Sequence, residues 1–386
     1  MESLFLYTLN HSKWAKSMFD RYAKEGWLLD PKEKITEKTL IRHRNKHWKN
    51  LNNPRNTNII SDLRQFKNSS LLTIMTRDYL KLSDLSENLS SISSLAEICI
   101  QCAYESAVSS EINKIDSQIN QDSDIPDLII IAMGKLGGNE LNPASDIDLI
   151  FSHTKNGVMS PTKNSIPEID SSYFFSKVVN RICEILSWKT FEGIVFRVDL
   201  RLRPHGDFGP KSISIDGLEK YFRYDALPWE RFAWVKAKVI NQPFLQNKKK
   251  FNYFVSKLND LKENFVYRPY PDYRSIDSIR TLHEKIKSQH ILTKEKRTGT
   301  YIFNVKLENG GIRDIEFLIQ FQQLIRGGKE NALRSPSTLR VLKELHRLDF
   351  ISSEHERLIY ESYGFWRRIE HHLQYALNEQ THTVTT

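Results

Sequence analysis

The sequence predicts an α+β fold in which a small mixed sheet with its own helices is flanked by two helical regions. Three segments in the middle of the chain have strand-like patterns, whereas the flanking parts repeat apolar residues at helical spacing. A polar stretch, QDSDIPD at 121–127, separates the first helical region from the strands. We therefore expect an N-terminal helical region at 1–120, a central core at 121–248 and a C-terminal helical region at 249–386 that packs on the core.

The composition is that of a soluble globular protein. Of the 386 residues, 39% are apolar and 27% are charged, and the length allows two or three packed units. The N-terminus lacks the basic and long apolar segments of a secretory signal, and we see no membrane-spanning run, so we expect a cytoplasmic protein with no membrane partner. A net charge of +9 indicates an anionic partner, such as nucleotide phosphates or an acidic protein surface. A nucleic acid is the least favoured partner, because only this overall charge suggests one.

Two of the predicted strands carry aspartates. The β-branched run at 128–133 suits a buried strand, and it ends in the glycine-rich turn GKLGG. In ASDIDLIFS, which follows, Asp146 and Asp148 alternate with apolar residues, so a strand there places both carboxylates on one face. The segment GIVFRVDLRLRP at 193–204 alternates in the same way and places Asp199 on a face with arginines.

The three aspartates suit a metal site for nucleotidyl transfer. Such a reaction develops negative charge on phosphate oxygens, which divalent cations stabilise, and Mg²⁺ prefers carboxylate ligands and water. We therefore predict that Asp146, Asp148 and Asp199 hold Mg²⁺, or Mn²⁺ in its place, and carry catalysis. The pattern D-x-D alone is common in turns. Its combination with a buried strand, a double glycine and a later Asp-Arg strand is what favours metal binding.

Glycines and cations near the aspartates predict phosphate contacts. Gly137 and Gly138 allow close approach of backbone N–H groups to phosphate, and Lys135 adds a charge. Arg201 and Arg203 can hold phosphate oxygens in bidentate fashion, although neutralising Asp199 is an alternative.

Two other patterns are assigned to packing and surface. Cys99 and Cys102 form a lone C-x-x-C in a helical stretch without a second pair of ligands nearby, which favours core packing over a zinc site. His371 and His372 lie on a charged helical segment and are expected at the surface.

The motifs resemble those of the glutamine synthetase adenylyltransferase/adenylyl-removing enzyme family. The resemblance rests on AMGKLGGNELNPASDIDLIF, FRVDLRLRPHGDFGP, PWERFAWVKAKVI, GGIRDIEFLIQFQQLIRGG and RRIEHHLQYALNEQTHT, and it covers about residues 60 to 385. It implies a polymerase-β-like nucleotidyltransferase core at 121–248. Matched by position, Asp146 and Asp148 are the metal-binding D-x-D and Asp199 is the third carboxylate. The further nucleotide-binding or phosphate-binding candidates, and charged motif positions without an assigned role, are Ser145, Glu230, Arg231, Lys236, Arg313 and Glu316.

The resemblance also implies a reaction and partners. The family carries two such units, one that removes AMP from glutamine synthetase and one that attaches it, and this chain holds a single copy of each motif. The form VDLRLRPHGDFGP and the downstream IRGG are similar to the removing unit. This implies phosphorolysis of adenylyl-tyrosine, with phosphate as the co-substrate and ADP as the product, under control of a PII-type signal protein and glutamine.

One departure from the family pattern concerns the segment before Trp229. The family has Gly-Arg-Asp there, whereas this chain has Ala226-Leu227-Pro228, so any phosphate contact of that Arg-Asp pair is lost. The residues leave open ATP-dependent adenylylation of glutamine synthetase, or a non-catalytic module that binds glutamine synthetase or the PII-type protein.

Overall fold

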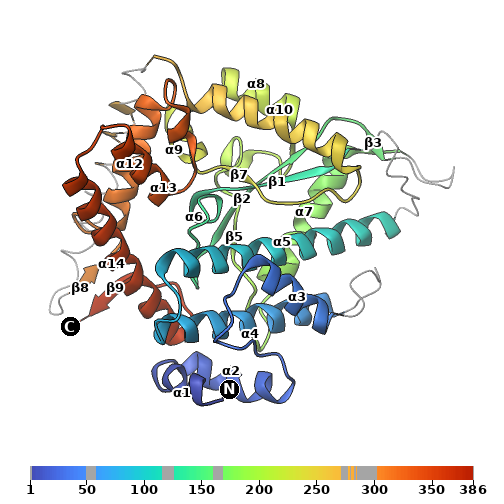
Figure 1. Cartoon of the computed structure of the whole chain (residues 1–386). Helices are drawn as coiled ribbons and strands as arrows, with labels where there is room; N and C mark the ends of the chain where they lie inside the picture. The colour runs from blue at the N-terminus through green and yellow to red at the C-terminus, as the bar shows by residue number, and fades with distance from the viewer. Residues whose placement is uncertain are drawn as a thin grey trace.

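The computed structural model describes residues 2–48, 58–114, 126–159, 168–270, five positions between 277 and 284, and 302–385. It has the predicted α+β architecture (Figure 1). A small mixed sheet lies between helices, and the N-terminal and C-terminal parts of the chain are helical. The predicted boundary at residue 120 lies outside the described residues. No helix in the described part of the chain is long and apolar enough to cross a membrane.

The N-terminal helices form a layer under the sheet. Side-chain oxygens of Ser12 and Thr36 accept hydrogen bonds from backbone N–H groups at the starts of the second and third helices. The fourth and fifth helices are long and mostly buried, because they lie between the first helices and the sheet. The helices are α1 (Glu2–His11), α2 (Lys13–Lys24), α3 (Glu37–His47), α4 (Ile59–Tyr79) and α5 (Leu85–Lys114).

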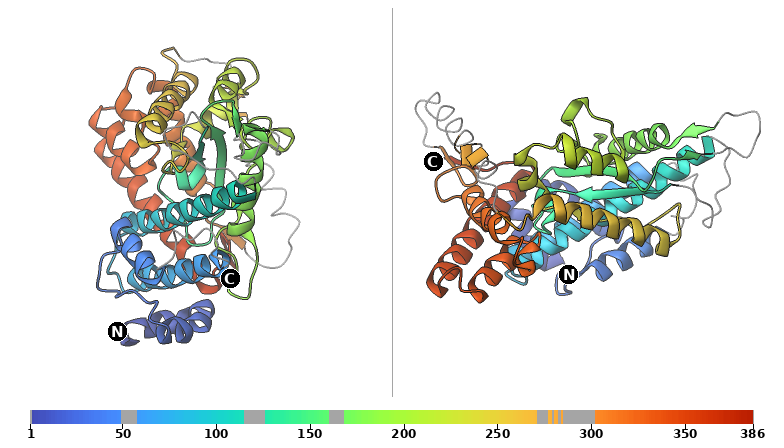
Figure 2. Two further views of the ribbon diagram at one scale, coloured as in Figure 1. Left: turned by 90° about the vertical axis from the view of Figure 1, so that its right-hand side faces the viewer. Right: turned by 90° about the horizontal axis from the view of Figure 1, so that it is seen from above.

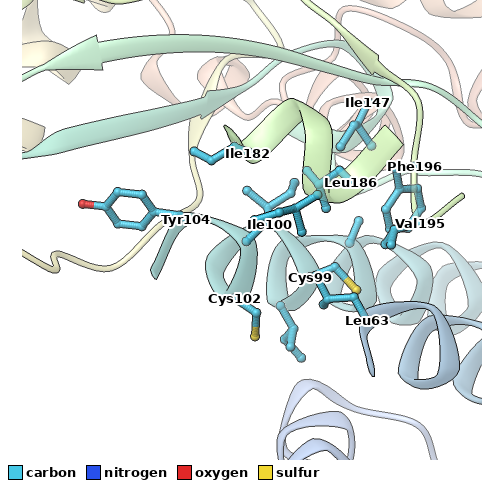
Figure 3. Packing of buried hydrophobic residues seen from close by; sticks show 14 of the residues in the cluster. Leu63, Cys99, Ile100, Cys102, Tyr104, Ile147, Ile182, Leu186, Val195 and Phe196 are labelled. Atoms are coloured by element: carbon cyan, nitrogen blue, oxygen red, sulfur yellow. The ribbon is translucent and has the colours of Figure 1, made fainter. Parts of the chain in front are cut away.

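Cys99 and Cys102 lie in the core between α5 and its neighbours. Both are almost fully buried members of this core, and Figure 3 shows the Cys99 thiol close to Leu63. Burial raises the pKa of both thiols, so they remain uncharged. The packing prediction is confirmed.

The central sheet has the strand order β5-β2-β1-β7, with β6 also paired to β2. β1 and β2 are antiparallel, whereas β5 and β6 run parallel to β2. The strands are β1 (Leu128–Ala132), β2 (Ile147–His153), β5 (Val198–Asp199), β6 (Ile213–Ser214) and β7 (Lys238–Val239), and a separate hairpin-like pair is β3 (Val158–Met159) with β4 (Ile169–Asp170).

Both faces of the sheet are covered, which explains why β1 is continuously apolar. Ile130 packs into the core shared with α5 and α7, whereas its neighbours Ile129 and Ile131 pack into a second core with α8 and α10 on the opposite side. The covering helices are α6 (Gly134–Gly137), α7 (Ser171–Ser187), α8 (Ile215–Tyr224), α9 (Pro228–Trp234) and α10 (Lys248–Val266).

The strand predicted at 193–204 is much shorter in the structure. Only Val198–Asp199 pairs with β2, because the chain turns directly afterwards. The Asp199 side chain accepts a hydrogen bond from the Arg201 backbone N–H, and the Arg203 N–H donates to the Leu200 carbonyl. Arg203 therefore does not share a strand face with Asp199.

The C-terminal helices gather at one end of the molecule, beside the sheet (Figure 2). They have a core of their own, and the end of α14 also packs on the N-terminal helices, where Ser12 Oγ donates to the Tyr375 carbonyl at 2.6 Å. The elements are β8 (Ile302–Asn304), α12 (Ile312–Arg326), α13 (Thr338–Arg347), α14 (Ser353–Leu377) and β9 (Thr383–Thr385), which pairs with β8.

The expectation that both histidines of α14 are at the surface is wrong for His371. This side chain is fully buried, with Nδ1 3.6 Å from the carboxylate of Asp78, whereas His372 is exposed. The reason is that α14 packs with this face against the N-terminal helices, an arrangement between distant segments that local pattern does not indicate.

Candidate active site

The three predicted aspartates lie together in one cleft of about 760 Å³. Asp148 on β2 is in register with Asp199 on the parallel strand β5, and Asp146 precedes Asp148 by two positions. Ile147 between them is fully buried in the core, so Asp146 and Asp148 both face the cleft. The sequence pattern of the D-x-D strand therefore places its carboxylates as expected.

Two of the three aspartates are paired with arginines. Arg197 binds Asp146 through two hydrogen bonds, Nε to Oδ1 at 2.6 Å and Nη2 to Oδ2 at 2.7 Å. Arg201 donates from Nε to Asp199 Oδ2 at 2.9 Å, and these hydrogen bonds hold the pKa of Asp199 below its ordinary value.

Asp148 is half-buried, like the other two aspartates, but its pKa is shifted in the opposite direction from that of Asp199. Its pKa is raised to about 6, first by burial and then by the negative charges of Asp199 and Asp146. Carboxylates that repel one another in a partly buried position gain from a cation placed among them. This electrostatic arrangement separates Asp148 from an ordinary surface aspartate.

The glycine that borders Asp148 is Gly134, which the sequence reasoning passed over. It has a φ of +51°, and a Cβ added there would lie 2.6 Å from Asp148 Oδ2. Gly137 and Gly138 do not line the cleft: a Cβ on Gly137 would lie 1.9 Å from the Lys236 carbonyl oxygen. Gly137 thus allows α6 to pack closely on the segment before β7. The signal for Gly134 was its position directly after the first strand.

Lys135 and Lys236 both line the cleft, and each forms an ion pair with a buried carboxylate. Lys135 Nζ lies 2.9 Å from Oε1 of Glu370 on α14. Lys236 Nζ lies 2.8 Å from Oε2 of Glu140 and 2.7 Å from the hydroxyl of Thr338 on α13. The C-terminal helices therefore help to position two cations of the site.

Other predicted residues have mixed placements. Ser145 and Arg201 line the cleft, whereas Arg203 and Glu230 do not. Arg203 donates to backbone carbonyls of its own loop, among them that of Leu200 at 2.9 Å. Glu230 is buried and accepts the Tyr221 hydroxyl at 2.7 Å. The charged motif positions Arg313 and Glu316 on α12 do line the cleft, together with Gln320.

Several cleft residues were not assigned a site role in advance. Arg197 could have been found, because it lies two positions before Asp199 on the same predicted strand face. Trp229 and Gln380 fall within motifs that carry the family resemblance, but Lys306 has no signal in the sequence.

Carboxylate oxygens, which this cleft offers, are the ligands that a divalent cation such as Mg²⁺ prefers. Three carboxylates face one cleft, and the pKa of Asp148 is raised by burial and then by repulsion from the other two, both of which a bound cation would offset. In the described part of the chain, however, no three carboxylate, imidazole or thiolate ligands are already gathered closely enough to hold one ion. Asp146 and Asp199 would have to exchange Arg197 and Arg201 for the metal. With the metal bound, Asp146, Asp148 and Asp199 would be its ligands, and it would neutralise charge that develops on phosphate.

A small mixed sheet that carries a D-x-D and a third aspartate over a cation-lined cleft is the arrangement of nucleotidyltransferases. The comparisons agree with this class. Residues 9–252 match the family model described as glutamate-ammonia ligase adenylyltransferase, and residues 280–386 match a model described as GlnD PII-uridylyltransferase. Since the first match covers more than half of the chain, the chain belongs to the glutamate-ammonia ligase adenylyltransferase family.

Curated relatives are named bifunctional glutamine synthetase adenylyltransferase/adenylyl-removing enzyme. The relative from Shewanella loihica is 35% identical over 83% of this chain, and that from Aromatoleum aromaticum is 36% identical over 84%. The relative from Chromobacterium violaceum is 37% identical over 83% of the chain. These matches cover 32%, 32% and 34% of the respective relatives, so the chain spans about a third of their length.

Proposed function

We propose that this chain removes AMP from glutamine synthetase by phosphorolysis of adenylyl-tyrosine, in a reaction that depends on Mg²⁺ or Mn²⁺. The observation that carries the proposal is the cleft itself, which is lined by Asp146, Asp148 and Asp199 together with the cations Lys135 and Lys236. The names of the curated relatives support glutamine synthetase as the substrate. The resemblance of VDLRLRPHGDFGP to the removing unit supports the direction of the reaction.

In this reaction an oxygen of inorganic phosphate attacks the phosphorus of the adenylyl group. The bond between that phosphorus and the tyrosine oxygen breaks, the tyrosine oxygen takes up a proton, and ADP leaves. Lys135 and Lys236 are placed to bind phosphate oxygens as positive charges. Arg313 on α12 is a further cation of the same cleft. These side chains orient the incoming phosphate, and their charges offset its repulsion by the adenylyl group.

A PII-type signal protein is the proposed regulatory partner. The support is the match of residues 280–386 to the model described as GlnD PII-uridylyltransferase, together with the family resemblance.

The decisive experiment is the release of ADP from adenylylated glutamine synthetase in the presence of phosphate and Mg²⁺. We expect the double variant Asp146→Asn with Asp148→Asn to lose activity by on the order of 10³-fold, since the stabilisation of phosphate charge is lost. The matched control is Asp225→Asn with Asp260→Asn, two exposed aspartates outside the cleft. Full activity in the first double variant would refute the proposed site.

The same material distinguishes the two alternatives. Transfer of label from ATP to unmodified glutamine synthetase, without phosphate-dependent release, would assign adenylylation instead. A non-catalytic role is favoured by one observation, the pairing of Asp146 and Asp199 with arginines. Capture of glutamine synthetase without turnover in either direction would establish that role.

A further inference from the structure

A second cavity, of about 580 Å³, adjoins the candidate active site. Its walls come from α2, α4, the segments 143–146 and 189–197, and the end of α14. Asp146 and Arg197 line this cavity as well as the catalytic cleft. A cavity of this size falls within the range of roughly 300–1,000 Å³ that is typical of small-molecule sites.

The feature that sets this cavity apart is Lys67 on α4. Its side chain lines the cavity although the residue is only 4% exposed. Its Nζ lies 5.8 Å from the ring centroid of Trp14 and 5.9 Å from that of Phe196, which are cation–π distances. Within the ranges that the structure describes, no carboxylate lies close enough to Lys67 to form an ion pair.

The residues around Lys67 do not offset its charge. Arg64 is a second cation, and its guanidinium donates to backbone carbonyls, among them that of Gly193 at 3.0 Å. The Cys99 thiol is uncharged, because burial raises its pKa. Glu192, the buried carboxylate of the cavity wall, is already paired with Arg21 at 3.1 Å.

The pKa of Lys67 is lowered, as expected for a buried ammonium without a carboxylate partner. Burial is the main cause that lowers it, to about 8, so the ammonium is still largely charged at neutral pH. A buried cation without an anion is unfavourable, and a bound anion would recover that free energy. Trp14, Met18 and Phe196 form an apolar part of the wall beside the ammonium, whereas the carboxylates Asp146, Glu192 and Glu379 also line the cavity.

We propose that this cavity is a second ligand site, distinct from the catalytic cleft, that binds a small organic anion. The carboxylate or phosphate of the ligand pairs with Lys67, and its apolar body packs on Trp14 and Met18. Arg197 lies on the wall shared with the cleft and holds Asp146, so the occupied cavity adjoins a catalytic carboxylate directly. Binding does not depend on the proposed transfer reaction.

The test is calorimetric titration of the full chain with benzoate and, separately, with phenyl phosphate, which distinguish a carboxylate site from a phosphate site. The variant is Lys67→Met, which keeps the length of the side chain and removes its charge. The matched control is Lys189→Met, because Lys189 is an exposed lysine that lines the same cavity. We expect at least one probe to bind, with at least tenfold lower affinity for Lys67→Met and less than twofold for Lys189→Met.

A second measurement observes the Lys67 ammonium itself, in the chain that keeps Lys67. Reductive ¹³C-methylation of the lysines gives each a carbon NMR signal that reports its protonation. The Lys67 signal, assigned by its absence in the charge-keeping variant Lys67→Arg because the pKa of Lys135 is also lowered to about 8, should move to a higher pKa when the probe is bound. Absence of binding by both probes, or equal binding by Lys67→Met, would overturn the proposal. Displacement of the probe by metal-free ATP would also overturn it, since the cavity would then be part of the nucleotide cleft.

Discussion

The lysines and the arginines of the cleft are held by carboxylates in opposite ways. Lys135 pairs with Glu370, whose side chain is fully buried among residues of the C-terminal region. Arg197 pairs with Asp146 while 61% of its side chain remains exposed. A buried pair has exchanged water for protein on both sides, whereas an exposed pair is in continuous competition with water and ions.

The second lysine and the second arginine follow the same division. Lys236 and Glu140 are both nearly buried, and Lys236 holds the pKa of Glu140 below its ordinary value although burial alone would raise it. Arg201 is largely exposed, and its partner Asp199 is one of the three candidate metal ligands. The lysines of the cleft are therefore fixed in place by buried carboxylates, and we propose that the exposed arginines on the aspartates are exchanged for a metal.

The largest effect should come from breaking a buried pair. We expect Glu370→Gln to lower the free energy of unfolding by about 3–5 kcal/mol, because it leaves the Lys135 ammonium without its carboxylate. Arg367, 3.5 Å from the same carboxylate, loses part of its compensation as well. Denaturant unfolding measures the change.

The control for this variant is Glu361→Gln, an exposed position on the same helix, for which we expect a change within about 0.5 kcal/mol. Adding Lys135→Met to Glu370→Gln should restore part of the loss, since the Lys135 charge is then absent and Arg367 still has Glu316 at 3.8 Å. Equal stability of Glu370→Gln and Glu361→Gln would show that the buried pair contributes nothing.

The contrast between the two kinds of pair also marks what the sequence could predict. The alternation of Asp146, Ile147 and Asp148 is a local pattern, and it correctly placed both carboxylates on one side of β2. The register of Asp148 with Asp199 follows from two parallel strands that lie about fifty residues apart, and the patterns of both segments were readable. The local alternation of polar and apolar residues was therefore sufficient to predict the three aspartates of the cleft.

The positions of Lys135 and Lys236 depend on contacts between distant segments, which local sequence patterns do not specify. Glu370 meets Lys135 only because α14 packs beside the sheet, and their separation in the sequence is 235 residues. The strand predicted beyond Asp199 is absent because the Asp199 side chain accepts a hydrogen bond from the Arg201 backbone N–H. This local bond ends the strand, although the alternation of apolar residues continues. The same packing of α14 buried His371, contrary to expectation.

A medium effect is expected at the exchangeable pair. Arg197→Gln removes the cation that competes with a metal for Asp146, so we expect Mn²⁺ to bind about tenfold more tightly, which corresponds to about 1.4 kcal/mol. Electron paramagnetic resonance of free Mn²⁺ measures the affinity. The control is Arg181→Gln, which breaks an arginine–glutamate pair on α7 outside the cleft and should leave the affinity unchanged. Unchanged or weaker Mn²⁺ binding by Arg197→Gln would contradict an exchange of arginine for metal.

The smallest effect is expected on the stability of that same variant. Because Arg197 is exposed, its two hydrogen bonds to Asp146 compete with water, and we expect Arg197→Gln to change the free energy of unfolding by less than about 1 kcal/mol. Denaturant unfolding in metal-free buffer measures it beside Glu370→Gln. A loss as large as that of Glu370→Gln would mean that the arginine is a structural partner of Asp146. Separating Asp146 from Arg197 would then cost much free energy. The distinction between fixed lysines and exchangeable arginines would fail at Asp146, one of the proposed metal ligands.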